Sequence, residues 1–221
     1  MKRALIIGHT GGIGQALAAR LAADGAEVVG LSRSTDGLDL TDEASVARII
    51  GAQVGSFDLV MVATGALEMG AFRPEKALRQ VSGDYLAAQF ALNAMGPLLV
   101  LKHAVRLMPR VGLSRFAALS ARVGSIGDNG LGGWYSYRAA KAALNQLVHT
   151  AAIEVARSHP EAVVVTLHPG TVDTSLTARY RGDHAAMPPA EAAANLIQVL
   201  AGLTAAQSGG FYDWQGLVVP W

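Results

Sequence analysis

Short, continuously apolar segments alternate with longer helical segments along this chain, and this alternation constrains its fold more than any other feature. Runs such as Val163-Val164-Val165 contain no polar residue, which is typical of strands buried on both faces. The β-α-β-α order predicts an α/β protein with a doubly wound parallel sheet covered by helices on both faces. Ligands of such sheets bind at the carboxyl ends of the strands, so we expect the functional residues there.

The expected elements follow from hydrophobic periodicity and turn residues. The strands are Leu5–Gly8, Ala26–Leu31, Leu38–Leu40, Phe57–Ala63, Ser114–Ser120, Ala162–His168 and Leu217–Val219. The helices are Gly12–Ala23, Glu43–Val54, Gly83–Met108, Ser136–Ser158 and Ala190–Leu203. Neither a repeat nor a long linker divides the chain, so we expect residues 1–221 to form a single domain.

Composition narrows the class of ligand. Hydrophobic residues make up 51% of the chain, charged residues only 16%, and the formal net charge is +1, with Lys and Arg scattered. This balance argues against a nucleic-acid groove and favours a small uncharged substrate. The chain has no cysteine, which excludes disulfides, thiolate metal sites and a cysteine nucleophile. Its histidines occur singly, so we expect no metal site. With neither a membrane span nor a signal peptide apparent, we expect a cytoplasmic protein.

A glycine-rich turn joins the first strand to the first helix. Gly8 permits a tight turn, Gly12 lets a pyrophosphate approach the backbone, and Gly14 lets the helix pack on the strand. The N–H groups at the start of the helix then face the phosphates. This strand–turn–helix context predicts dinucleotide binding. The contributing residues are Gly8, Thr10, Gly12, Ile13 and Gly14.

The end of the second expected strand indicates which dinucleotide binds. An acidic residue there would hold the ribose 2′-hydroxyl and repel a 2′-phosphate, but this chain has Ser32 followed by Arg33. A guanidinium pairs bidentately with phosphate, which favours NADP, with NAD as the alternative. Arg33 in a solvated loop is the competing interpretation. Asp39-Leu40 is placed to contact adenine, although Asp39 also falls in the region that caps the next helix.

Tyr137 and Lys141 lie one helical turn apart, so their side chains share a face of the expected helix. An ammonium about 4–5 Å away, together with an oxidised nicotinamide, would lower the pKa of the phenol by a few units. Such a tyrosine exchanges a proton with a carbonyl or alcohol oxygen. A Tyr-x-x-x-Lys spacing alone is common on amphipathic helices. Its place two elements after the glycine turn and just after a strand end favours the catalytic interpretation.

In the order and spacing of these motifs the sequence resembles the short-chain dehydrogenase/reductase family over nearly its whole length. The resemblance rests on the glycine turn, Asp39, Asn93, Tyr137 with Lys141, and Pro169-Gly170 followed by Thr174. It implies a Rossmann-type sheet of about seven strands in the order 3-2-1-4-5-6-7 and a homodimer or homotetramer. Gly132–Tyr137 and Gly210–Trp214 are most like the C-factor-like branch of this family.

The resemblance also implies roles for individual residues. Asn93 would position a water of the proton relay, and Lys141 would hold the ribose hydroxyls. The segment from His168 to Thr174 would lie over the nicotinamide. Its contributing residues are Pro169, Gly170, Val172 and Thr174.

Two positions depart from the family pattern. The usual Asn-Asn-Ala-Gly after the fourth strand is replaced by Val62-Ala63-Thr64-Gly65, of which Gly65 still permits close approach of the adenosine side. The family's catalytic serine, which binds the substrate carbonyl oxygen, aligns with Ala121. Counting back from Tyr137 points instead to Ser125, which we favour. Ser120 is adjacent, but strand alternation would turn it to the other side of the sheet.

The sequence therefore predicts an NADP(H)-dependent oxidoreductase that interconverts a carbonyl and an alcohol on a small uncharged molecule. The preference for NADP favours reduction as the direction of the reaction. The stretch Ser175–Pro188 is expected to be a mobile lid. The alternative is a nucleotide-binding regulatory or signalling module of the same fold with little turnover, motivated by the serine that is missing at position 121.

Overall fold

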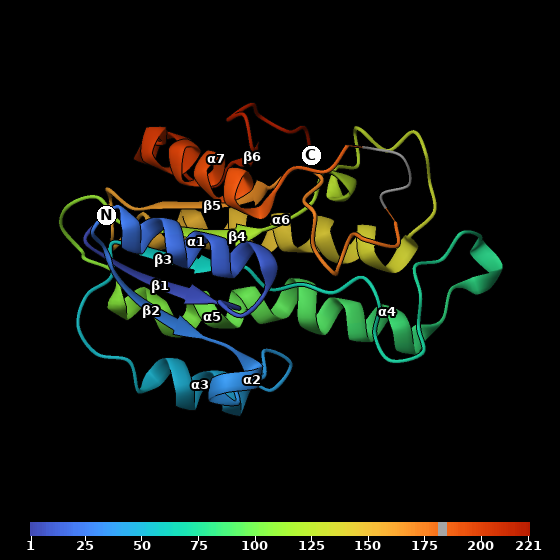
Figure 1. The fold of residues 1–221 in the computed structure, drawn as a ribbon, viewed down its shortest axis with the longest axis horizontal. Helices are drawn as coiled ribbons and strands as arrows, with labels where there is room; N and C mark the ends of the chain where they lie inside the picture. The colour runs from blue at the N-terminus through green and yellow to red at the C-terminus, as the bar shows by residue number, and fades with distance from the viewer. Residues whose placement is uncertain (181–184) are drawn as a thin grey trace.

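One parallel sheet runs through the described part of the chain (Figure 1). The computed structural model describes residues 1–180 and 185–221, so residues 181–184 of the expected lid lie outside the described residues. Neighbouring strands follow the order β2-β1-β3-β4-β5-β6 and pair in parallel, which confirms the predicted α/β class. The strands are β1 (Arg3–Ile7), β2 (Glu27–Leu31), β3 (Leu59–Val62), β4 (Arg115–Leu119), β5 (Val163–His168) and β6 (Phe211–Asp213).

Helices cover both faces of this sheet (Figure 1). Helices α1 and α7 pack their apolar side chains on one face, and α3, α5 and α6 pack on the other. Helix α4 lies against α6. The helices are α1 (Gly12–Ala23), α2 (Arg33–Asp36), α3 (Glu43–Gly51), α4 (Gly83–Phe90), α5 (Gly96–Ala104), α6 (Tyr135–Val155) and α7 (Pro189–Gly202).

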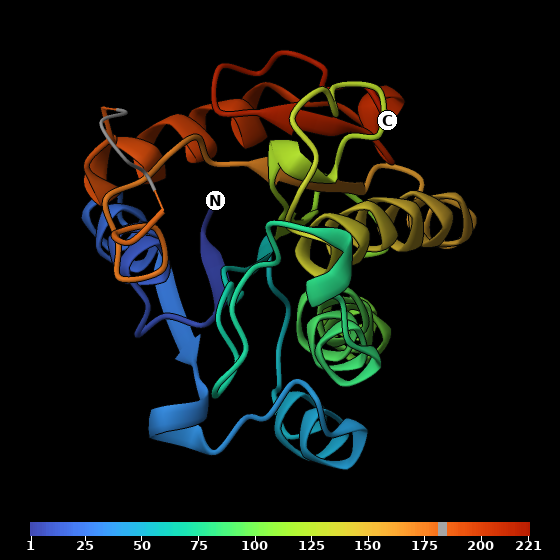
Figure 2. The ribbon, with the colours of Figure 1, turned by 90° about the vertical axis from the view of Figure 1, so that its right-hand side faces the viewer.

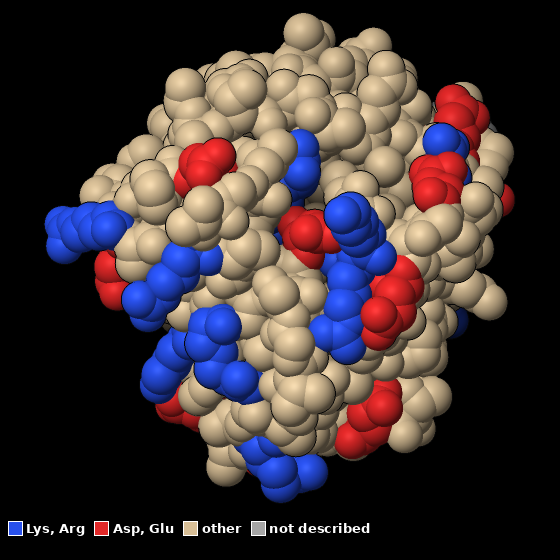
Figure 3. Space-filling view, turned by 90° about the vertical axis from the view of Figure 1, so that its left-hand side faces the viewer, with Lys and Arg blue, Asp and Glu red and all other residues tan. Residues whose placement is uncertain are grey.

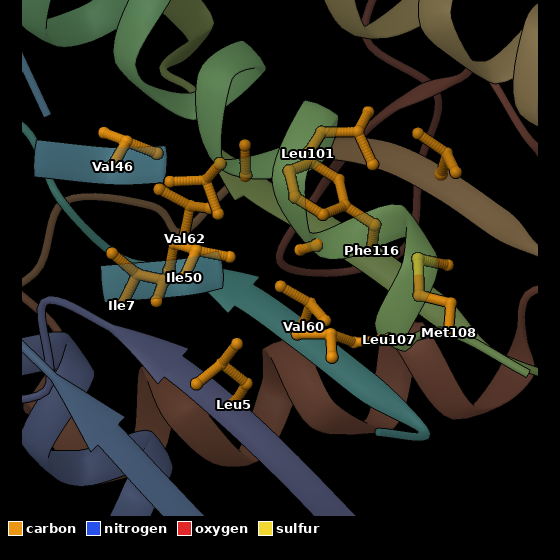
Figure 4. Close-up of a cluster of buried hydrophobic side chains, with 14 of the residues drawn as sticks. Leu5, Ile7, Val46, Ile50, Val60, Val62, Leu101, Leu107, Met108 and Phe116 are labelled. Atoms are coloured by element: carbon orange, nitrogen blue, oxygen red, sulfur yellow. The ribbon is translucent and has the colours of Figure 1, made fainter. Parts of the chain in front are cut away.

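The larger core cluster lies between the sheet and α3, α5 and α6. Leu5, Val60 and Phe116 project from β1, β3 and β4 toward Ile50 and Leu101 of the covering helices (Figure 4). All five side chains are buried, as the continuous apolar strands predicted. This packing holds the strand ends rigidly, which is what a site assembled from several loops requires.

Two expected strands differ from the structure, so the sheet has six strands among the described residues instead of about seven. Leu38–Leu40 forms no strand, because the Asp39 carboxylate accepts hydrogen bonds from the Thr41 N–H and hydroxyl and turns the chain. The last strand is β6 rather than Leu217–Val219. Asp213 accepts from the N–H groups of Gln215 and Leu217 and ends that strand in a turn.

The long helix expected at Gly83–Met108 is interrupted. A π-helical turn, Ala91–Met95, separates α4 from α5. Pro97 in α5 has no N–H, so the carbonyl of Asn93, four residues earlier, lacks its usual helical donor. Wide helical turns of this kind occur frequently at functional sites. The periodicity of apolar residues continues through the interruption, which is why the sequence predicted one helix.

The loops after β3, β4 and β5 gather at the carboxyl end of the sheet, which faces the viewer in Figure 2. On the opposite side of the molecule, Lys and Arg side chains lie among Asp and Glu side chains (Figure 3). In the described part of the chain, none of the helices combines the length and apolar character needed to cross a membrane.

Candidate active site

The glycine turn has the geometry that its sequence predicted. Gly8 has φ +86°, and a Cβ there would lie 2.7 Å from the Thr64 methyl group. A Cβ on Gly14 would lie 2.1 Å from the Gly8 carbonyl oxygen, so only glycine lets α1 approach β1 this closely. A Cβ on Gly12 would lie 2.8 Å from the Thr174 methyl group, which brings the turn next to the segment after β5.

A cavity of about 520 Å³ opens at this end of the sheet. Its walls come from the glycine turn, the segments after β3, β4 and β5, and the first turns of α6. The lining includes Gly11–Ile13, Ala63–Gly65, Leu119–Val123, Trp134, Tyr137, Lys141, His168–Val172, Thr174–Thr177 and Tyr180. Glycine backbone at a helix start, beside a cavity of this volume with a largely apolar lining, fits a dinucleotide together with a small substrate.

Tyr137 and Lys141 enter this cavity from α6, as the spacing predicted. The Lys141 Nζ donates a hydrogen bond to the Leu119 carbonyl oxygen at the end of β4, 2.7 Å away. It lies 5.7 Å from the centre of the Tyr137 ring. Both side chains are buried, with 7% of Tyr137 and 2% of Lys141 exposed. A phenol and an amine are therefore held side by side, away from bulk water.

Burial sets the protonation of this pair in the protein alone. It raises the pKa of the Tyr137 phenol above its ordinary value, and it lowers the pKa of Lys141 to about 7. Loss of hydration sets this direction of the tyrosine pKa in the protein without a cofactor, and the expected lowering by Lys141 together with an oxidised nicotinamide stays a prediction for the complex. The phenol stays protonated at neutral pH.

Asn93 lies in the π-helical turn beneath the β3 loop. Its side-chain amide donates to the Ala66 carbonyl oxygen at 2.9 Å and to the Gln89 side chain at 2.6 Å, and its oxygen accepts from the Ala66 N–H. A Cβ on Gly65 would lie 3.1 Å from the Asn93 oxygen and 3.7 Å from the Lys141 Nζ. The side chain of Asn93 thus fixes the backbone beside Lys141.

The three positions considered for the missing serine differ clearly. Ala121 lines the cavity, but its methyl group cannot donate a hydrogen bond. Ser125 is absent from the described lining, and its hydroxyl accepts from the Asp128 N–H at 3.1 Å. Ser120 lines the cavity, and its buried hydroxyl has no partner in the described part of the chain. A buried hydroxyl without a partner is costly unless a ligand or water satisfies it.

The residues expected around the adenosine lie at the carboxyl ends of β1 and β2. Arg33 begins α2 directly after β2, and it is exposed. The Thr10 and Ser34 hydroxyls lie 3.3 Å apart, which joins this segment to the glycine turn. The Asp39 carboxylate is already occupied by Thr41, whose hydrogen bonds lower its pKa. Asp39 therefore stabilises its own turn whether or not adenine is bound.

The segment after β5 completes the cavity. Pro169, Gly170, Val172 and Thr174 all line it. The Thr177 hydroxyl donates to the Val172 carbonyl oxygen and ties the segment into a compact turn.

His168 and Trp134 also line the cavity, and neither is among the individual catalytic or cofactor-binding residues that the sequence predicted. His168 ends β5, its buried Nδ1 has no partner among the described residues, and burial lowers its pKa to about 4, so the ring is neutral. Its position directly before Pro169-Gly170, at a strand end, was the available signal. Trp134 packs edge-on against Tyr137 and Tyr180, at ring separations of 6.3 Å and 5.5 Å.

Chemically, the cavity combines a dinucleotide-type turn with a protonated phenol and a nearby amine. In the described part of the chain, no group of three or more His, Asp or Glu side chains could hold a metal ion. This arrangement defines an oxidoreductase site built on a Rossmann-type sheet.

Comparisons with known proteins agree. The family model for short chain dehydrogenases matches residues 2–185. The C-signal of Myxococcus xanthus is 37% identical over 146 residues, which cover 66% of this chain and 84% of that protein. The 1-hydroxy-2-glutathionyl-2-methyl-3-butene dehydrogenase of Rhodococcus sp. (strain AD45) is 31% identical over 202 residues, covering 90% of this chain and 85% of that protein.

Among solved structures, a short-chain dehydrogenase/reductase from Burkholderia multivorans with bound NADP has a TM-score of 0.84. The two sequences are 27% identical, and the match covers 100% of this chain and 99% of the Burkholderia multivorans chain. The chain belongs to the short-chain dehydrogenase family of oxidoreductases. Its similarity to the C-signal confirms the relation to the C-factor-like branch.

Proposed function

We propose that this protein reduces a small uncharged aldehyde or ketone to an alcohol with NADPH. The observation that carries the proposal is that Tyr137, Lys141 and the glycine turn line one cavity. The largely apolar lining favours an uncharged substrate. The NADP bound by the Burkholderia multivorans relative and the position of Arg33 favour NADP(H), with NAD as the alternative. The proposal treats residues 1–221 as one domain, supported by the continuous sheet.

In this mechanism the Tyr137 phenol donates its proton to the carbonyl oxygen. NADPH, when bound, supplies the hydride that the carbonyl carbon accepts. The raised pKa of Tyr137 keeps the phenol protonated, which suits reduction. The ammonium form of Lys141 stabilises the resulting tyrosinate. Pro97 has no N–H to donate to the backbone carbonyl oxygen of Asn93, four residues earlier. This oxygen would hold the proposed water through which Tyr137 regains a proton.

The proposed cofactor contacts follow the cavity. The glycine turn would hold the pyrophosphate, Arg33 the 2′-phosphate, and Asp39-Leu40 the adenine. Gly65 would lie against the adenosine side. The segment Pro169–Thr174 would cover the nicotinamide, and Lys141 would hold the ribose hydroxyls.

We also propose that Ser120 supplies the hydrogen bond to the substrate oxygen. Its unpartnered hydroxyl in the cavity wall supports it over Ser125, which is not among the described residues that line the cavity. The direct experiment for the whole proposal is a panel of aldehydes, ketones and quinones assayed with NADPH. Binding of NADPH without turnover on any member would favour the alternative, a regulatory module, for which Ala121 is the motivating feature.

Replacing Ser120 by Ala should lower kcat/KM by about 10²–10³-fold, the usual loss when one donor to a developing oxyanion is removed. Ser125→Ala is the matched control and should leave kcat/KM nearly unchanged. Adding Ala121→Ser to the Ser120→Ala variant should restore much of the activity. A loss in Ser125→Ala with full activity in Ser120→Ala would contradict the assignment.

Replacing Arg33 by Glu should weaken NADPH binding by about 10–100-fold, since a charge-assisted hydrogen bond contributes about 1.5–3 kcal/mol. The affinity for NADH, which has no 2′-phosphate, should not fall. Fluorescence titration of both cofactors measures the ratio. Arg20→Glu changes the charge equally at a residue that pairs with Asp24 on α1. An equal loss of NADPH affinity in both variants would assign the effect to net charge instead.

A further inference from the structure

The first turn of α6, which carries Tyr137, has no N-cap of its own. The N-cap position is Trp134, whose side chain has no oxygen to accept a backbone N–H. Trp134 also has φ +52°, the only positive value of a non-glycine residue in the described part of the chain. A bulky residue adopts this conformation only when its surroundings enforce it.

Glu75, which lies in the loop after β3 and 61 residues before Ser136, supplies the missing cap. Its two carboxylate oxygens accept the Ser136 N–H at 3.3 Å and 3.2 Å, and the Ser136 hydroxyl donates to the same carboxylate. Its backbone carbonyl oxygen accepts the Trp134 N–H at 2.5 Å. A single residue therefore holds both the N-cap position and the first turn of α6.

The carboxylate of Glu75 is buried, with 2% of the residue exposed. Among the described residues, no Lys or Arg forms an ion pair with it. A buried carboxylate without a cation is unfavourable unless hydrogen-bond donors and a favourable field replace water. The free N–H groups and the positive end of the α6 dipole provide both.

The contacts of Glu75 lead directly to the cavity. Ser136 immediately precedes Tyr137, so fixing its N–H and hydroxyl fixes the turn from which the phenol projects. The Trp134 ring, oriented by its enforced backbone conformation, packs edge-on against Tyr137 and Tyr180. We infer that Glu75 is a positioning residue that caps α6 and thereby fixes the positions of the Tyr137 phenol and the Trp134 ring at the cavity. This inference rests on the proposed function.

Kinetics of Glu75 variants test it first. Glu75→Ala should lower kcat by about 10–100-fold, because a displacement of about 1 Å at a reacting group costs on the order of 10² in rate. The NADPH Kd should change little, since the glycine turn is separate. Glu75→Gln keeps the size and one acceptor oxygen, so it should lose less activity, and it serves in place of Glu75→Ala if that variant does not fold.

The control separates positioning from general stability. Asp42 caps α3 by accepting the Ala44 N–H at 3.0 Å, so Asp42→Ala removes a carboxylate cap far from Tyr137. Both variants should lower the free energy of unfolding, but only the change at Glu75 should lower kcat. Equal kcat values in the two variants, both folded, would overturn the inference.

A measurement without catalysis distinguishes failure of this inference from failure of the proposed function. Fluorotryptophan incorporated into the protein should give ¹⁹F resonances for Trp134, Trp214 and Trp221, with Trp134 assigned by Trp134→Phe. Glu75→Ala, or Glu75→Gln in its place, should shift the Trp134 resonance and leave the others. An unmoved Trp134 resonance would overturn the inference even if the protein reduces carbonyls. A shifted resonance would support it even if no carbonyl is reduced.

Discussion

Replacing Tyr137 by Phe should lower kcat for carbonyl reduction by about 10³-fold while NADPH still binds. The lost phenol is the proposed acid, and a positioned acid or base commonly contributes 10²–10⁴-fold. In the described part of the chain, the Tyr137 hydroxyl makes no hydrogen bond to a protein group, so its removal leaves the packing of the ring intact. Steady-state rates and a cofactor titration on the same preparations measure both quantities.

Tyr135→Phe is the matched control, because Tyr135 begins the same helix but is 38% exposed and does not line the cavity. It should retain the kcat of the parent. If Tyr137→Phe kept most of its turnover with every active substrate, proton donation by this phenol would have to be abandoned. Equal losses in the two variants would indicate a general effect on α6.

Replacing Lys141 by Met should lower kcat by about 10²-fold or more and stabilise the cofactor-free protein near neutral pH. Activity falls because the variant lacks the ammonium that stabilises the tyrosinate. Stability rises because burial lowers the pKa of Lys141 from 10.5 to about 7, so the folded protein binds this proton less well than the unfolded chain does. Methionine fills a similar volume without a charge.

The stability difference should depend on pH in a defined way. At pH values below about 7, Lys141 is charged in both states, and the native protein bears the full cost of burying the charge. As pH rises from about 7 toward 10.5, only the unfolded chain keeps the proton, so the parent gains stability and the advantage of Lys141→Met shrinks. Urea unfolding of both proteins across this range measures the difference. A difference that does not vary with pH would contradict the lowered pKa.

Local patterns predicted the sheet and the position of the cavity well. The strands β1, β3, β4 and β5 are continuous apolar runs, and burial on both faces leaves them few alternatives. The segment Leu38–Leu40 shows the limit of this reasoning, since it is apolar enough for a strand, but the Asp39 side chain satisfies the backbone in a turn instead.

The contents of the cavity were only partly predictable. Tyr137 and Lys141 are one helical turn apart, so a local rule brings them together. Ser120 directly follows β4, and that its buried hydroxyl lines the cavity without a partner among the described residues is recorded by no local pattern. Glu75 meets Ser136 only because two loops distant in sequence converge, and no periodic pattern records that meeting. The pKa of Tyr137 is raised by burial, which depends on the packing of the folded chain, so the direction of this shift also required the structure.

Transfer of deuterium from NADPH that carries deuterium at both positions of nicotinamide C4 is the most direct test of the proposed chemistry. The parent protein is incubated with labelled cofactor and the best carbonyl of the panel, and the product is analysed by mass spectrometry. We expect an alcohol with one deuterium on the carbinol carbon from the parent, and almost none from Tyr137→Phe. Absence of labelled alcohol across the panel, from protein that binds NADPH, would contradict carbonyl reduction at this cavity.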